Sequence, residues 1–262
     1  MKNDIAARET SPVRSLERAL HLLSVMEGAG WAMGLTELGR AAQLPKPTVL
    51  RLLSVLEKYG FAEKRQGRYR LGPAVIPLAH AYVLGNDLAR VSLPVLQELA
   101  RASEGTASAF VRLGFQRVAI QRVEGQNPLR YTPPPIGQRL PIHLGVGKVL
   151  AAAMPPEEVS QMLDQLGDIR LADGEILTRK MFLAQLDQIR RQGYVISCNE
   201  RMMGAASVGA PVIDASGATI AVASVAGPTD RLTPKKLERL SVEVRGAAKA
   251  IADRYDGGSR NG

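Results

Sequence analysis

Two short helical patterns separated by a tight turn, within residues 36–58, constrain the fold more than any other feature. Thr36 can cap the first pattern, TELGRAAQ, whose Leu38 and Ala42 share one face. The segment LPKPT follows, and Pro47 suits the first turn of a second helix. Along that helix the apolar residues repeat at helical spacing, namely Val49, Leu52, Leu53 and Leu56. The pattern predicts a helix-turn-helix.

The face of the second helix opposite this apolar stripe is polar and basic. At about 100° per residue it holds Pro47, Leu50, Arg51, Ser54 and Lys58. Residues 40–70 contain eight lysines and arginines against two glutamates, a net charge of +6 in a 262-residue chain whose total is +9. A charge run is usually a solvated face. On the outer face of a helix-turn-helix, however, it favours binding to nucleic acid.

A basic hairpin is expected directly after this helix. FAEKR and RYRL read as two short strands, at 61–65 and 68–71, joined by a turn at Gln66-Gly67. Basic side chains at its tip and flanks, Lys64 and Arg68 among them, would reach phosphates or a minor groove. The order of three helices and a hairpin predicts a winged helix. A helical bundle decorated with lysines is the alternative.

The second half of the chain changes to alternating helices and strands. Strands are expected at 106–114, 116–125, 193–197, 207–214 and 218–226, and helices at 95–103, 148–154, 156–166, 179–192 and from Thr233-Pro234 onward. The proline-rich segment 131–143 is unsuited to a central strand. Antiparallel strands flanked by helices predict an α+β fold.

The expected organisation has two domains joined by an apolar connector. It comprises a disordered tail at 1–12, a winged helix-turn-helix at 13–74, a linker helix at 75–92, an α+β domain at 93–252 and a disordered tail at 253–262. The connector also offers an apolar face to a partner subunit.

Catalytic, metal and cofactor sites are not expected. Cys198 is the single cysteine, which excludes an internal disulfide and fits a reducing cytoplasm. The three histidines, at positions 21, 80 and 143, do not fall at ligand spacing. The segment GVGK at 145–148 lacks the glycine spacing and the Ser or Thr of a phosphate-binding loop. No apolar run approaches the roughly 18 residues of a membrane span, and the polar N-terminus has no apolar signal segment, so no membrane partner is expected.

The N-terminal half resembles the DNA-binding domain of the IclR family of bacterial transcription regulators. The motifs SLERAL (15–20), LPKPT (44–48) and GRYRLG (67–72) occur in the family's order. The resemblance, together with the basic hairpin, implies DNA contacts by Lys46, Pro47, Thr48, Leu50, Arg51, Lys64 and Arg68. Leu50 would contact a thymine methyl group. Gln43 replaces the family's usual turn glycine, at a strain of about 1 kcal/mol.

The resemblance continues to Ile251 through LPIHLGVGKVLAA, GAPVIDASG and SVAGPTDRLT. It implies a GAF-like effector-binding domain whose pocket lies beside the sheet. The pocket residues it implies are Gly145, Val146, Ser197, Ala205, Ser207, Ser224 and Ala226.

Several pocket positions depart from the family pattern. The loop 143–147 is one residue shorter, and Ser197, Ser207 and Ala226 stand where Asp, Cys and Ser are frequent. Smaller neutral groups at these positions favour an effector that is less polar or bulkier than a minimal oxoacid.

The expected function is a ligand-responsive transcription regulator. A cytoplasmic homodimer, pairing further into a tetramer, would bind a near-palindromic double-stranded DNA operator. A small-molecule effector, a catabolic metabolite, would modulate that binding. The alternative is a cytosolic small-molecule-binding protein or enzyme whose basic N-terminus is an oligomerisation module. Salt-dependent retention of residues 1–74 on heparin or duplex DNA would separate the two.

Overall fold

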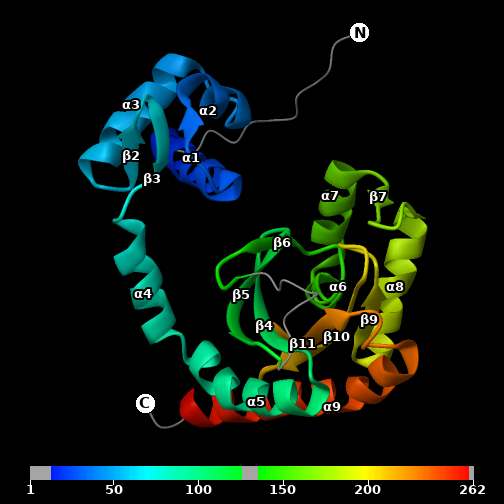
Figure 1. Ribbon diagram of the computed structural model, residues 1–262. Helices are drawn as coiled ribbons and strands as arrows, with labels where there is room; N and C mark the ends of the chain where they lie inside the picture. Colours follow the sequence, from blue (N-terminus) through cyan, green and yellow to red (C-terminus); the bar gives the residue numbers. More distant parts are fainter. Residues whose placement is uncertain (1–12, 126–134, 260–262) are drawn as a thin grey trace. The chain divides into compact units, whose positions relative to one another are not determined.

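A computed structural model describes residues 13–125 and 135–259 of the chain (Figure 1). It divides into two compact units, Met1–Gly85 and Asn86–Gly262. The expected tail at 1–12, and the last residues of the tail expected at 253–262, lie outside the described residues.

The first unit is a winged helix-turn-helix. Its elements are α1 (Arg14–Ala29), β1 (Met33–Gly34), α2 (Leu35–Ala41), α3 (Lys46–Lys58), β2 (Ala62–Arg65), β3 (Arg68–Leu71) and α4 (Val75–Gly85). The strands form an antiparallel sheet in the order β1-β3-β2. Leu22 of α1, Leu38 of α2, Leu53 of α3 and Tyr69 of β3 are buried together in its core. The expected helix-turn-helix and hairpin are confirmed, whereas the two-residue strand β1 was too short to be found by pattern.

Both tight turns of this unit use positive φ angles. Gln43, between α2 and α3, has φ +53°, and the Leu44 N–H donates to the Gly39 carbonyl at 2.9 Å to close the turn. Gln66 and Gly67 have φ +49° and +76°. Two consecutive positive angles suit the right-handed twist of a two-residue hairpin. The turn therefore fixes the register that places Arg65 opposite Arg68.

The connector differs from the single linker helix expected over 75–92. Helix α4 ends at Gly85, and α5 (Asp87–Ser103) begins after Asn86, whose side chain accepts a hydrogen bond from the Ala89 N–H at 2.9 Å. This side-chain cap starts a new helix. Pro94 lies inside α5, whereas the sequence predicted a helix that begins after it. One face of α5 is buried in the hydrophobic core of the second unit. The second unit consequently starts at Asn86 and not at residue 93.

The second unit is built on a six-stranded antiparallel sheet in the order β6-β5-β4-β11-β10-β9. Its strands are β4 (Thr106–Leu113), β5 (Gln116–Val123), β6 (Arg139–Pro141), β9 (Val195–Cys198), β10 (Ala205–Ile213) and β11 (Thr219–Pro228). This confirms the α+β fold. In the described part of the proline-rich segment, residues 135–143, the only strand is β6, at an edge of the sheet, where a missing N–H is tolerated.

Helices cover both faces of this sheet (Figure 1). Helices α5 and α9 (Pro234–Ser259) pack on one face, while α6 (Gly147–Ala152), α7 (Pro156–Leu166) and α8 (Arg179–Gln192) enclose a core on the other. A short ribbon of β7 (Ile169–Arg170) and β8 (Ile176–Leu177) was not expected. No helix in the described ranges combines the length and the apolar character needed to cross a membrane.

The C-terminal helix is longer than expected. Residues 253–259, assigned by sequence to a disordered tail, belong to α9. Tyr255 packs against the core one turn beyond the buried Ile251. The apolar stripe thus continues one turn beyond Ile251, to Tyr255.

A buried ion pair joins the loops on the α6 side of the sheet. The Lys148 ammonium of α6 and the Glu200 carboxylate, between β9 and β10, are 2% and 10% exposed and form a charge-assisted hydrogen bond. Lys148 Nζ also donates to Gln185 Oε1 of α8 at 2.9 Å, and Glu200 Oε2 accepts the Gly145 N–H at 2.9 Å. One pair therefore connects α6, α8, the loop before α6 and the β9–β10 connection.

Replacing Lys148 by methionine should strongly destabilise the protein. The variant leaves the Glu200 charge buried without its counter-ion, which typically lowers the free energy of unfolding by about 3–5 kcal/mol. Urea unfolding followed by circular dichroism measures the change. Lys180→Met, which removes an exposed lysine from α8, is the control and should stay within about 0.5 kcal/mol of the parent protein. Equal stability of the two variants would contradict a structural role for the pair.

Candidate DNA-binding surface and ligand pocket

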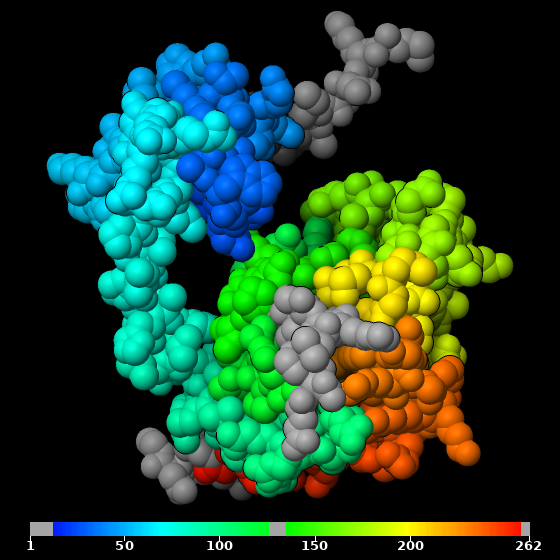
Figure 2. All heavy atoms as spheres, viewed as in Figure 1, coloured from blue at the N-terminus to red at the C-terminus, as the bar shows by residue number. Residues whose placement is uncertain are grey.

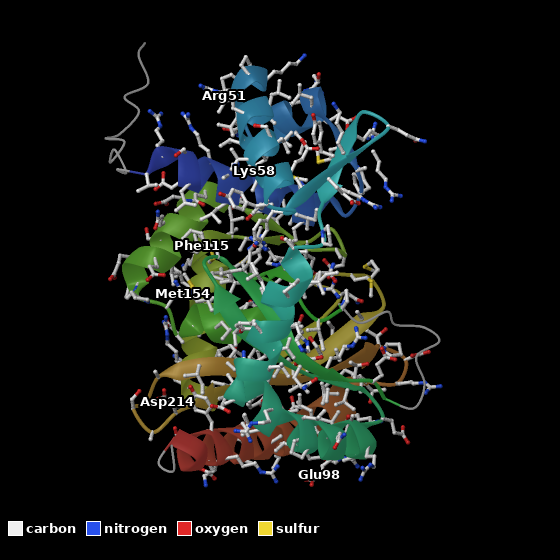
Figure 3. The ribbon with its side chains drawn as sticks, turned by 90° about the vertical axis from the view of Figure 1, so that its left-hand side faces the viewer. Arg51, Lys58, Glu98, Phe115, Met154 and Asp214 are labelled. Carbon is white, nitrogen blue, oxygen red and sulfur yellow. The ribbon has the colours of Figure 1, made fainter. Side chains whose placement is uncertain are left out.

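The outer face of α3 carries the residues expected to contact DNA. Lys46, Pro47, Leu50 and Arg51 are exposed, and Thr48 is half-buried in the first turn. The opposite face holds the buried Val49, Leu53 and Leu56. Arg51 and Lys58, labelled in Figure 3, both come from this helix. Packing of the apolar stripe therefore turns a set of polar, positively charged and methyl-bearing side chains toward solvent.

The hairpin side chains expected to contact DNA are partly held by the protein itself. Arg68 Nη2 pairs with Glu37 Oε2 of α2 at 3.0 Å, and Arg68 Nε donates to the Ala32 carbonyl at 2.9 Å. Glu37 also accepts the Gly34 N–H at 2.8 Å. The exposed Lys64 places its ammonium 5.3 Å from the ring of the buried Tyr69. Arg68 therefore fixes the hairpin against α2, although its side chain is still 48% exposed.

Arg65 is a further candidate that sequence reasoning counted only as part of the charge. It lies at the end of β2, directly before the hairpin turn, and is exposed. Within the described part of the chain, its guanidinium has no hydrogen-bond or ion-pair partner. Its position in the sequence next to Gln66-Gly67 could have identified Arg65 as a candidate, because residues beside a hairpin turn project farthest from the body of a domain.

All seven residues expected in the effector pocket line one cavity of the second unit. The space inside it that is accessible to the centre of a water molecule is about 40 Å³, and all empty space out to its mouth, solvent included, is about 540 Å³. The strand register explains why residues from several strands line the same cavity, because directly paired residues share a face of the sheet. Ser207 pairs with Ser197 on one side and with Ala226 on the other, and Ser224 pairs with Ser108 on β4. The loop before α6 adds Gly145 and Val146.

Five polar or charged side chains of the lining were absent from the expected set. They are Thr106, Ser108, Arg117, Glu200 and Arg201. Thr106 and Ser108 alternate on β4 as Ser224 and Ala226 do on β11, so strand alternation could have identified them. Arg117 gave no such signal, since an arginine on a strand ordinarily reads as an exposed residue.

Arg117 of β5 is a buried cation beside the loop 143–147. It is 3% exposed, and its guanidinium lies 5.2 Å from the Phe110 ring centroid. Arg117 Nη1 donates to the carbonyl oxygens of Leu144 at 2.5 Å and Pro141 at 3.3 Å. A Cβ atom at Gly147 would overlap this guanidinium and the Ile142 carbonyl. The glycine lets the loop close around the arginine.

Two titratable groups near the pocket have shifted pKa values. Burial, and secondly the charge of Arg117, lower the pKa of His143. Burial, and secondly the charge of Glu200, raise the pKa of Cys198. A nucleophilic cysteine needs a lowered pKa, so these surroundings give Cys198 no catalytic activation.

Comparison with known proteins gives the same family for both units. The IclR helix-turn-helix domain model matches residues 15–66, and the model of the bacterial transcriptional regulator IclR C-terminal domain matches residues 80–253. The HTH-type transcriptional repressor AllR of Escherichia coli strain K12 is 28% identical over 242 residues, covering 91% of this chain and 89% of AllR. AllR of Klebsiella pneumoniae is 29% identical with the same coverage.

Solved structures share the fold over nearly the whole chain. A putative IclR transcriptional regulator from Silicibacter sp. TM1040 superposes with a TM-score of 0.81 at 25% identity, covering 92% of this chain and 96% of that one. An IclR homologue of Microbacterium hydrocarbonoxydans, solved in complex with 4-hydroxybenzoate, has a TM-score of 0.73 at 22% identity and covers 93% and 99%. Together these matches show that the chain belongs to the IclR family of bacterial transcriptional regulators.

Proposed function

We propose that this protein is a transcriptional regulator that binds a near-palindromic double-stranded DNA operator. A small-molecule effector in the pocket of the second unit would raise or lower its affinity for that operator. The observation that carries the proposal is the exposed, positively charged face of α3, on a chain that also encloses a cavity lined by polar side chains of the large sheet. The repressor function of AllR and the 4-hydroxybenzoate held by the Microbacterium homologue support the same division of roles.

Helix α3 is the proposed recognition helix. Arg51 would donate to base edges in the major groove, and Leu50 would contact a thymine methyl group. Lys46, Pro47 and Thr48, at the start of the helix, would lie near the phosphates. This assignment follows from exposure, since these side chains surround the outward face of a helix whose other face is fully packed.

The hairpin is the proposed wing, with Arg65 and Lys64 reaching the DNA backbone or minor groove. Arg68 would contribute in a different way. Its bonds to Glu37 and Ala32 position the hairpin, and only its exposed edge would face a phosphate.

The proposed homodimer rests on α4. No residue of this helix is buried in the single chain, although it is apolar on all sides. Its exposed apolar side chains are Ile76, Leu78, Tyr82, Val83 and Leu84. The helix belongs to the cyan segment of Figure 2. A helix that is apolar all round is normally buried, so a second copy of this chain would cover it. Pairing of dimers into a tetramer, and a cytoplasmic location, belong to the same proposal.

Effector control requires a different affinity of the effector for two arrangements of the DNA-binding units. The change in operator affinity is limited to that difference. The rival function is a small-molecule-binding protein or enzyme whose basic N-terminus only assembles subunits. It would predict no salt-dependent binding of the full chain to duplex DNA.

Arg51→Ala should weaken binding to the operator far more than binding to random DNA. Removing one base-specific hydrogen-bonding side chain typically reduces discrimination by about 1–3 kcal/mol, whereas non-specific binding depends on total charge. Fluorescence anisotropy would compare an operator, selected from a random duplex pool, with a scrambled duplex. Equal losses of affinity on both duplexes would contradict the recognition role.

Arg65→Ala and Lys64→Ala should reduce affinity for both duplexes. Each should also lower the slope of log Kd against log salt by about 0.9 for every phosphate that the protein no longer neutralises. Arg68→Ala should show a smaller slope change together with lower thermal stability, because it breaks the bonds to α2. Lys180→Ala in the second unit is the control. An unchanged slope for Arg65→Ala would argue against the wing assignment.

Leu84→Asp should shift the protein from dimer to monomer. Leu84 is 71% exposed in the single chain, so the substitution leaves the core intact, and a buried charge at an apolar interface disfavours association. Sedimentation velocity measures the change. Leu183→Asp, at a 39% exposed leucine of α8, is the control. A dimer that survives Leu84→Asp would exclude α4 from the interface.

A further inference from the structure

Four residues other than glycine have positive φ angles in the described part of the chain. They are Gln43, Gln66, Glu104 and Asn199, with φ between +49° and +59°. This left-handed conformation is strained in an L-amino acid, because the Cβ atom comes too close to the following carbonyl oxygen. Most of the described positions with a positive φ accordingly hold glycine. A residue that is kept against such strain points to a use for its side chain.

The two such residues of the second unit use their side chains inside the protein. Asn199 accepts a backbone N–H at 2.8 Å, and the Glu104 carboxylate lies 3.5 Å from the Lys236 ammonium. The side chains of Gln43 and Gln66, in the first unit, have no hydrogen-bond partner among the residues that the structure describes. Gln66 belongs to the hairpin already proposed as the wing. Gln43 belongs to none of the DNA contacts proposed above.

The turn that holds Gln43 lies between two exposed cations. Arg40 is in the last turn of α2, and Lys46 begins α3. The Gln43 N–H donates to the Arg40 carbonyl at 3.2 Å, which ties the turn to the end of α2. Its two neighbours in the chain, Ala42 and Leu44, pack into the core of the first unit, whereas Gln43 is exposed. The packing of the neighbours therefore leaves the Gln43 side chain on the solvent side of the turn.

The charge around this turn favours a negatively charged partner. Residues 38–56 contain three lysines or arginines and no acidic residue. Glu37, directly before this stretch, pairs with Arg68 of the hairpin. In a helix-turn-helix bound to DNA, the first helix crosses the sugar-phosphate backbone and the second enters the major groove. The turn between the two helices consequently faces the phosphates that border the groove.

We propose that the side-chain amide of Gln43 donates a hydrogen bond to a DNA phosphate oxygen at the edge of the major groove. The inference rests on the proposed function, in which α3 is the recognition helix. A glutamine amide has two N–H donors, and such side chains contact phosphates in protein–DNA complexes. The contact positions the protein on the duplex without reading its sequence. Its gain offsets the strained backbone, and a glycine at this position has no side chain to make it.

Two substitutions at this position separate the contact from the strain. Gln43→Gly removes the amide and relieves the strain, whereas Gln43→Ala removes the amide and keeps the strain. Both should bind duplex DNA about fivefold more weakly than the parent protein, which corresponds to about 1 kcal/mol for one hydrogen bond. Fluorescence anisotropy with the full-length protein measures this. Gln43→Gly should unfold at a higher temperature than Gln43→Ala, because glycine adopts this φ freely.

The loss of affinity should have two further properties. It should be equal on the operator and on a scrambled duplex, because a phosphate contact carries no sequence information. The slope of log Kd against log salt should stay at the parent value, because glutamine is neutral and neutralises no phosphate. Gln43→Lys should instead bind both duplexes more tightly and increase the slope by about 0.9, since its ammonium neutralises one phosphate.

Gln165→Ala is the matched control, since it removes an exposed glutamine side chain from α7 in the second unit. It should bind both duplexes as the parent does. Affinity equal to that of the parent in Gln43→Gly or in Gln43→Ala would overturn the proposal. A loss confined to the operator would assign the amide to a base and would overturn the phosphate contact as well.

The same measurements distinguish failure of this inference from failure of the proposed function. If the parent protein shows no salt-dependent binding to duplex DNA, the proposed function fails and the inference fails with it. If the parent binds its operator and Arg51→Ala loses discrimination, while both Gln43 variants bind as the parent does, the inference alone fails.

Discussion

The buried ion pair between Lys148 and Glu200 holds the structure around the pocket together. It joins α6, α8 and the β9–β10 connection, and it brings Glu200 to the Gly145 N–H. Both loops that border the cavity are attached to this pair. Since separating buried charges is strongly unfavourable, the loops keep one arrangement. A second cation, Arg117, fills the space beside the loop 143–147 and donates hydrogen bonds to the carbonyl oxygens of Pro141 and Leu144.

The arginines of this protein differ in their surroundings. Arg51 and Arg65 stand in solvent on packed elements, where a flexible charge can meet phosphates and bases. Arg117 is enclosed by carbonyl groups and an aromatic ring, which hold its guanidinium in one position. Arg68 is intermediate between the exposed and the buried arginines, since it is half-exposed and pairs with Glu37 of α2. Burial and partners, not residue identity, separate the DNA surface from the pocket.

The sequence predicted the elements whose signals are local. Apolar spacing located α3, Gln66-Gly67 located the hairpin, and β-branched runs located five of the six strands in the large sheet. It failed where tertiary contacts decide. Asn86 starts a helix that runs through Pro94, and Tyr255 extends α9 by packing on the core. The seven pocket residues came from family resemblance, and they share one cavity. Arg117 was missed because only the folded sheet and loop reveal that it is buried.

The most direct test of these assignments is hydrogen–deuterium exchange of the full chain with and without its selected operator duplex. We expect slower exchange on DNA binding in peptides from 46–58 and 62–71, which hold the proposed recognition helix and wing. Peptides around residues 195–198, which line the pocket, should exchange at the same rate with and without the duplex, because they do not contact DNA. Protection confined to the second unit, with 46–58 unchanged, would contradict the assignment of the first unit as the DNA-binding surface.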